Sequence, residues 1–325
     1  MKATAKANVN IALIKYWGKR DEELILPTNN SLSLTLDGLY TTTTVQFKEE
    51  LTEDVFTLDG EKVTGVAFKR VTEFLNIIRK EAGKESLYTE INSKNDVPTA
   101  AGFASSASGF AALAAAASKA IGLNLSDEEL SRITRRGSGS ACRSIYGGFA
   151  EWQMGEKDDG SDSYAVPIAP RDHWDLRIAA VILTDKQKSV SSRDGMKRTV
   201  DSSAFFQGWV ESNPADLEGI KEGIKARDFH KVGEIAEANC LKMHATTLAA
   251  KPPFTYWTDS TMKVMQEVQK MRADGIPAYF TIDAGPNVKL LYLPEYEETI
   301  LERLKEISDV TEVILSRAGE GITYL

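Results

Sequence analysis

The alternation of apolar and polar residues predicts a first part of the chain that is rich in β structure. Runs of β-branched or alternating apolar residues favour strands at residues 9–14, 31–36 and 40–47. Two further short runs, 55–58 and 62–64, flank Asp59-Gly60, a pair typical of hairpin turns. The chain therefore opens with strands rather than helices.

Helical spacing appears next and then dominates the second part. Apolar residues three or four apart predict a helix from Phe68 that stops at Gly83, and Ser126 with Glu129 forms a capping box. Further helices are expected with Pro214 in a first turn, over 229–248, from Met262 to near Gly275, and over 300–307. Strands are expected at 176–183, 278–282, 288–293 and 313–315.

Length and charge limit the classes of protein that fit. A chain of 325 residues is long enough for about two domains, and we place the division at residue 184, giving 1–184 and 185–325. No Pro- or Ser-rich linker separates them, so the two parts should pack closely around a shared cleft. The formal charge of −8 argues against a nucleic-acid or anionic-membrane binder.

Other features indicate the compartment. The two cysteines are too few for a disulfide-rich protein, so a reducing cytoplasm is expected. We also expect no secretion signal at the N-terminus and no membrane span, because the small-apolar run 110–117 is far shorter than a bilayer requires.

A loop of small residues, 98–109, is a candidate phosphate site. It leads into a run of alanines that favours a helix, and an N-terminus of this kind presents free backbone N–H groups to an anion. Composition alone also allows a tightly packed small-residue helix with a serine cap. The chain has neither a Walker phosphate loop nor a complete dinucleotide-binding glycine motif.

A basic cluster forms a second candidate site. Lys15, Tyr16, Lys19 and Arg20 follow the predicted strand 9–14, and lysine charge beside a tyrosine hydroxyl suits a diphosphate. A lone cluster of this kind is also compatible with a solvated basic turn.

Motifs along nearly the whole chain resemble those of a known family. The loop 98–109 resembles the phosphate-binding motif of the GHMP kinase superfamily, with Phe103 in place of the usual leucine. Longer matches are similar to the signature of the diphosphomevalonate decarboxylase family, with Asn30 where serine is frequent; they lie at residues 8–36, 136–144, 191–196, 243–248, 252–257 and 281–287.

The resemblance implies a fold and an activity. It implies an α/β (α+β) two-domain GHMP kinase fold, with a left-handed βαβ N-terminal domain, a ferredoxin-like C-terminal domain and the active-site cleft between them. It implies ATP-dependent conversion of (R)-5-diphosphomevalonate to isopentenyl diphosphate, with ADP, phosphate and carbon dioxide released, in isoprenoid biosynthesis. Phosphoryl transfer to an alcohol needs charge neutralisation, usually by Mg²⁺, and we also expect a homodimer.

The resemblance also implies catalytic residues. Asp283, at a strand end before Ala-Gly-Pro, would orient and deprotonate the C3 hydroxyl, although an isolated aspartate there could form an Asx-turn. Arg143 would grip the substrate carboxylate, with a surface ion pair as the alternative. Ser192 would face the transferring phosphoryl group.

The binding residues follow in the same way. By similarity, the substrate diphosphate would be held by Tyr16, Lys19, Ser138, Gly139 and Arg193. ATP would be held by Gly102, Ser105, Ser106, Ala107 and Lys188. No acidic metal cage is evident, so Mg²⁺ would ride mainly on ATP oxygens, with Ser106 as a candidate ligand. His244, on a predicted helix, is expected to be a packed structural histidine.

Two other functions fit part of this pattern. A GHMP small-molecule kinase would phosphorylate a mevalonate-like alcohol and stop there, because the loop and the aspartate serve either outcome. A non-catalytic metabolite-binding protein on the same fold would bind ligand without turnover; the presence of Asp283, Arg143 and the serine loop together argues against it. Release of carbon dioxide separates the decarboxylase from the kinase, and turnover separates both from the binding protein.

Overall fold

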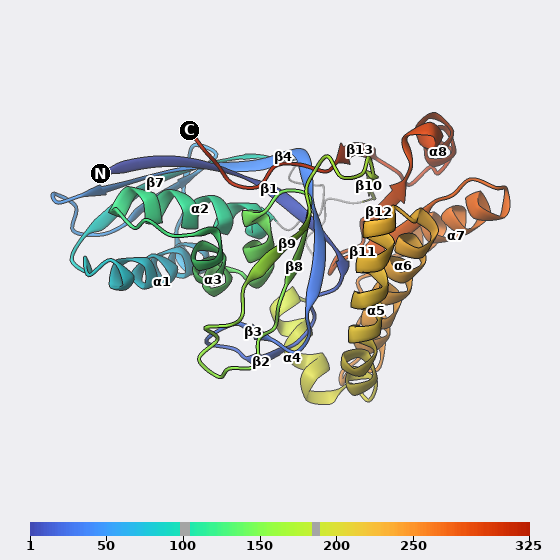
Figure 1. The fold of residues 1–325 in the computed structure, drawn as a ribbon, viewed down its shortest axis with the longest axis horizontal. Helices are drawn as coiled ribbons and strands as arrows, with labels where there is room; N and C mark the ends of the chain where they lie inside the picture. The colour runs from blue at the N-terminus through green and yellow to red at the C-terminus, as the bar shows by residue number, and fades with distance from the viewer. Residues whose placement is uncertain (98–104, 184–188) are drawn as a thin grey trace.

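The two halves of the molecule lie side by side, each built on its own sheet (Figure 1). The computed structural model describes residues 1–97, 105–183 and 189–325. Within these ranges no helix is long and apolar enough to cross a membrane.

The N-terminal half is built on an eight-stranded sheet. Its main path runs β14-β1-β4-β7-β5-β6, and β8 pairs with both β4 and β9. The strands are β1 (Lys2–Ile14), β4 (Ser31–Lys48), β5 (Val55–Leu58), β6 (Glu61–Lys62), β7 (Tyr88–Asp96), β8 (Phe149–Trp152), β9 (Ala165–Ala169) and β14 (Thr323–Tyr324). A separate small hairpin joins β2 (Lys19–Asp21) to β3 (Leu26–Pro27).

Helices cover one face of this sheet (Figure 1). They are α1 (Gly65–Glu81), α2 (Ser105–Ile121) and α3 (Asp127–Gly137), followed by the short 3₁₀ helix η2 (Gly139–Ile145). The six alanines within 111–117 of α2 are buried against β1 and β4, because side chains of this size let a helix approach a sheet closely. The capping box of Ser126 and Glu129 begins α3, as the sequence predicts.

The C-terminal half has a four-stranded antiparallel sheet in the order β11-β12-β10-β13. Its elements are β10 (Arg177–Ile182), α4 (Ser192–Ser202), α5 (Phe206–Ala226), α6 (Phe229–Leu248), α7 (Asp259–Ala273), β11 (Tyr279–Ile282), β12 (Val288–Tyr292), η3 (Pro294–Tyr296), α8 (Glu297–Lys305) and β13 (Glu312–Arg317). If β10 to β13 are numbered 1 to 4 in chain order, the sheet read from the β13 edge has the order 4-1-3-2. With the helices that connect these strands, this is the ferredoxin-like arrangement that the resemblance implies. β10 belongs to this sheet although it precedes residue 184, and the division there stays a prediction.

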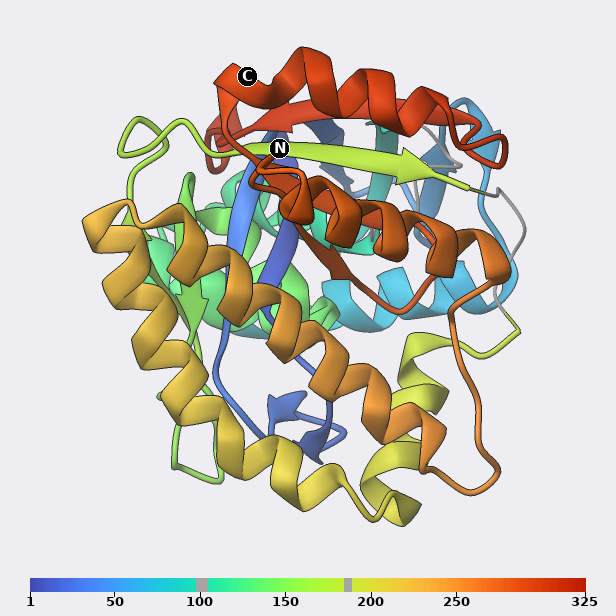
Figure 2. The same cartoon turned by 90° about the vertical axis from the view of Figure 1, so that its right-hand side faces the viewer.

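A continuous core joins the halves. Apolar residues of β1 and β4 pack with one face of β10 and with α5 and α6, which run side by side (Figure 2). The opposite face of β10 packs against α7 and α8. Because one apolar cluster contains residues of both halves, it holds the two halves in a defined relative position.

Three predictions about local structure are wrong or incomplete. Pro214 lies inside α5 rather than in a first turn, because the helix already begins at Phe206. The strands expected at 31–36 and 40–47 are one strand, β4, which passes through Gly38 at φ 75°. The sequence does not predict the short strands β2, β3, β8, β9 and β14. It also does not predict β7, whose residues are mostly polar, or α4, which begins with a short polar run.

Candidate active site

A cavity of about 470 Å³ lies where β1, η2, α4 and the turn after β11 meet. It brings together most of the residues proposed from the sequence: Tyr16, Lys19, Ser106, Ser138, Gly139, Arg143, Ser192, Arg193 and Asp283. These residues come from segments far apart in the chain, so their convergence is a property of the tertiary structure.

Asp283 follows β11 directly and forms an ion pair with Lys15, which follows β1 directly. The Lys15 Nζ lies 2.6 Å from Asp283 Oδ1 and also donates to the Ala12 carbonyl at 2.9 Å. Burial alone would raise the pKa of Asp283, but the charges of Lys15, Lys289 and Arg143 outweigh burial and hold that pKa below its ordinary value. Asp283 is therefore an ionised acceptor with 30% of its side chain exposed.

Arg143 is buried, with 1% of its surface exposed. Its Nε donates to Ser33 Oγ at 2.9 Å, one Nη to Ser31 Oγ at 2.6 Å and the other to Asn10 Oδ1 at 3.2 Å. None of the described carboxylates forms an ion pair with it, so the surface ion pair considered as an alternative is wrong. A buried guanidinium held by neutral acceptors at a cavity wall is suited to an incoming carboxylate.

Tyr16 and Lys19 form another wall of the cavity. Burial raises the pKa of Tyr16 well above its ordinary value, so the hydroxyl stays protonated and can donate to an anion. The Lys19 side chain is 6% exposed, and its ammonium donates to Glu22. Gly139 lies against the rings of Trp152 and Tyr16, and a Cβ there would come within 2.7 Å of Trp152. Only glycine fits this wall without displacing a ring.

The N-terminus of α4 contributes Ser191, Ser192 and Arg193 to the cavity. Ser191 caps the helix by accepting from the Asp194 backbone N–H. The positive end of the helix and the exposed Arg193 guanidinium add to the field that favours a phosphate.

The expected nucleotide residues are placed only in part. Ser106 lines the cavity, whereas Ala107 is buried and is not among the residues that line it. Ser105 begins α2. Gly102 and Lys188 lie outside the described residues. Within the described ranges, no group of three or more His, Cys, Asp or Glu side chains could form a metal cage.

Sequence reasoning missed Arg70 of α1, which also lines the cavity. Its Nη2 donates to the Gly137 carbonyl at 2.8 Å, and its guanidinium lies 4.5 Å from the centre of the Phe110 ring. Burial and the nearby charge of Arg193 lower the pKa of Arg70. Nothing in the helical pattern around residue 70 distinguishes this arginine from a surface one, so the sequence held no signal for it.

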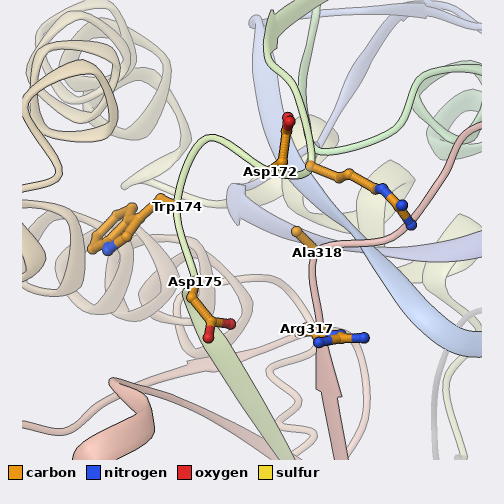
Figure 3. A pocket seen from close by; sticks show the side chains of 6 residues that line it. Asp172, Trp174, Asp175, Arg317 and Ala318 are labelled. Carbon is orange, nitrogen blue, oxygen red and sulfur yellow. The ribbon is translucent and has the colours of Figure 1, made fainter.

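A second cavity, of about 260 Å³, lies where the segment before β10 meets the end of β13 (Figure 3). Three of its charged side chains have partners: Asp175 pairs with Arg177, Arg317 with Asp37, and Arg171 with Glu320. It contains none of the residues proposed from the sequence, so the larger cavity is the candidate active site.

His244 is buried on α6, as expected for a structural histidine. Its Nε2 bonds the Ile282 carbonyl at 3.2 Å, and burial lowers the pKa of His244 to about 4. An unfolded histidine has a pKa near 6.5, so the unfolded chain binds the proton more readily. Stability from neutral His244 is therefore complete above pH 6.5 and decreases as the pH falls towards 4.

We expect His244→Gln to flatten this dependence. Urea unfolding at pH 7 and pH 5 should show a smaller loss of stability in the variant than in the wild type, because glutamine has no proton to gain. His230→Gln, at an exposed histidine, is the control and should keep the wild-type dependence. Equal losses in His244→Gln and wild type would contradict the prediction.

The fold and a cavity that gathers cations around one aspartate define a phosphoryl-transfer enzyme of the GHMP kinase class. Residues 7–165 match the diphosphomevalonate decarboxylase-like N-terminal domain, and residues 178–320 match the mevalonate 5-diphosphate decarboxylase C-terminal domain. The chain belongs to the diphosphomevalonate decarboxylase family.

The chain is similar to known proteins over nearly all of its own length. The diphosphomevalonate decarboxylase of Ganoderma lucidum is 42% identical over 95% of this chain and 80% of its own, and that of Homo sapiens is 40% identical over 92% and 78%. The crystal structure of mevalonate diphosphate decarboxylase from Staphylococcus aureus has a TM-score of 0.95 and 47% identity, covering 100% of this chain and 98% of its own. A structure of MDDEF in complex with MVAPP, AMPPCP and magnesium has a TM-score of 0.94 and 50% identity, covering 100% and 99%.

Proposed function

We propose that this chain catalyses the ATP-dependent decarboxylation of (R)-5-diphosphomevalonate to isopentenyl diphosphate, with ADP, phosphate and carbon dioxide released, in the mevalonate pathway. The observation that carries the proposal is the convergence of Asp283 and Arg143 on one cavity lined by Lys19 and Arg193. Phosphorylation of the tertiary C3 hydroxyl makes it a leaving group, and loss of the carboxylate supplies the electrons of the new double bond.

Asp283 would orient the C3 hydroxyl and accept its proton. Because its pKa lies below the ordinary value, the carboxylate is a weak base that is ionised at neutral pH. A loose phosphoryl-transfer transition state needs little proton removal early on, so a weak but well-placed acceptor suffices. Lys15 holds the carboxylate in place through its ion pair.

Arg143 would bind the substrate carboxylate. Its guanidinium has five N–H donors, and Ser33, Ser31 and Asn10 each take one. This leaves one N–H on each Nη, and a carboxylate would accept from both in a two-pronged contact. That contact would weaken as the carboxylate becomes neutral carbon dioxide, so the arginine would favour the reactant geometry without retaining the product.

ATP and Mg²⁺ are the cosubstrate and the cofactor. Of the described residues that line the cavity, Asp283 alone carries a carboxylate, so this chain would offer Mg²⁺ few oxygen ligands of its own. Ser106 is the hydroxyl of α2 that would face the ion, with ATP phosphate oxygens as its other ligands. When bound, Mg²⁺ would neutralise charge on the phosphates during transfer.

The Lys19 side chain should contribute to binding of the diphosphate end of the substrate and not to binding of the carboxylate end. We expect Lys19→Ala to weaken binding of diphosphomevalonate by about 1.5–3 kcal/mol, the range of a charge-assisted hydrogen bond, and to leave mevalonate affinity nearly unchanged. Releasing Glu22 costs little, because that side chain is 53% exposed. Calorimetric titration of both ligands at fixed salt tests this; equal losses for the two ligands would assign Lys19 to the fold or the general field.

One assay distinguishes the proposed function from its alternatives. Purified protein with ATP, Mg²⁺ and diphosphomevalonate should release carbon dioxide and ADP in equal amounts. A GHMP kinase would form ADP and a phosphorylated acid without carbon dioxide, and a binding protein would form neither. Either of these outcomes would refute the decarboxylase assignment.

We further propose a homodimer in a reducing cytoplasm, with 1–184 and 185–325 as the two domains. The two buried free cysteines, Cys142 and Cys240, support the compartment. Sedimentation equilibrium gives the oligomeric state directly, and a monomer mass would refute the dimer.

A further inference from the structure

The backbone of Lys15 is held on both sides by buried asparagine side chains. Asn239 Oδ1 accepts the Lys15 N–H at 2.8 Å, and Asn29 Nδ2 donates to the Lys15 carbonyl at 2.8 Å. Asn239 is 0% exposed and Asn29 is 3% exposed. Lys15 follows the last residue of β1, so these two contacts replace the ladder bonds that a strand would supply.

Asn239 is itself anchored. Its Nδ2 donates to Asp216 Oδ2 at 2.8 Å, and the same carboxylate oxygen accepts from Lys242 Nζ at 2.5 Å. The amide therefore has a fixed orientation, with its oxygen directed at the Lys15 N–H. A series of hydrogen bonds therefore runs from Asp216 of α5 through Asn239 of α6 to the backbone N–H of Lys15, whose side chain pairs with Asp283.

The same helix holds the partner of Lys15. One residue after Asn239, Cys240 Sγ accepts the Ile282 N–H at 3.1 Å, and His244 Nε2 bonds the Ile282 carbonyl at 3.2 Å. Ile282 is the residue directly before Asp283. α6 thus contacts the backbone at, or next to, both members of the Lys15–Asp283 pair.

We propose that α6 is the frame that sets the position of the Lys15 ammonium against the Asp283 carboxylate, with Asn239 and Asn29 as positioning residues. The inference rests on the proposed function, because it concerns the reaction in which Asp283 acts. Asn239 and Asn29 are not among the described residues that line the cavity, so neither would contact the substrate. They should affect the rate of reaction and not the binding of substrate.

The test compares three variants of similar volume, Asn239→Leu, Asn29→Leu and Asn213→Leu. Asn213 is a buried asparagine of α5 whose Nδ2 has no partner among the described residues, and it serves as the matched control. Calorimetry with diphosphomevalonate counts the binding sites, and kcat is expressed per binding site. We expect kcat to fall by about 10²-fold in the first two variants with substrate Kd unchanged, since small misplacements at a reacting centre have effects of this size.

The double variant Asn239→Asp with Asp216→Asn tests the contact itself. It keeps an acceptor for the Lys15 N–H and reverses the hydrogen bond to residue 216, so we expect kcat per site to recover relative to Asn239→Leu. Asn29→Leu keeps the test decisive if Asn239→Leu does not fold. If the wild type turns over and both Asn239→Leu and Asn29→Leu have the same kcat per site as Asn213→Leu, the inference is overturned and the proposed function stands. Absence of wild-type turnover would instead refute the proposed function.

Discussion

Asp283→Asn should abolish most of the turnover while substrate still binds. The amide is nearly isosteric, but it cannot take a proton from the C3 hydroxyl, and removal of an acid-base residue typically lowers the rate by at least about 10²-fold. Stability should also fall, because Lys15, whose side chain is 3% exposed, loses its counter-ion. The measurement is release of ADP and carbon dioxide per binding site, with sites counted by titration with diphosphomevalonate.

Asp54→Asn is the matched control for this variant. Asp54 is fully buried at its side chain and pairs with Arg79, away from the cavity. Breaking this pair should lower the thermal midpoint and leave kcat per site unchanged. Near-parental turnover in Asp283→Asn would remove Asp283 from the chemistry, and a loss of similar size in both variants would indicate a general effect of broken ion pairs.

Arg143→Lys should lower activity by about 10²-fold although charge is preserved. Lysine lacks the planar fork, and a single ammonium cannot satisfy Ser31, Ser33 and Asn10 and also hold a carboxylate in two places. The substrate would then sit with its carboxylate misaligned. Steady-state kinetics with diphosphomevalonate at saturating ATP would show a higher KM, a lower kcat or both.

Arg135→Lys provides the comparison. Arg135 is equally buried and is likewise held by neutral acceptors, the carbonyls of Leu24, Gly160 and Ser163, but it does not line the cavity. We expect this variant to lose stability and to keep its kinetic constants. Unchanged kinetics in Arg143→Lys would assign Arg143 a structural role like that of Arg135.

Local pattern determined much of the fold. The hairpin at Asp59-Gly60, the capping box at Ser126 and the strands before and after the turn at Asp283 depend on residues close together in the chain, and the structure contains them where the sequence predicted. Motifs spread along the chain indicated the family, and the family indicated the ferredoxin-like sheet. Pro214 shows the limit of this reasoning, because packing of α5 carries a helix through a residue that usually begins one.

The environment of each active-site residue was decided by tertiary structure. Lys15 and Asp283 are 268 positions apart and Lys15 and Asn239 are 224 apart, so no spacing rule connects them. Burial, which depends on every packed neighbour, makes Arg143 a buried guanidinium without a described carboxylate partner. The charges of Lys15, Lys289 and Arg143, brought together by the fold, hold the pKa of Asp283 below its ordinary value against the effect of burial. The sequence by itself identified the chemical groups and the family. The contacts between these groups and the pKa of each titratable one arise only when distant segments pack into one low-dielectric cleft.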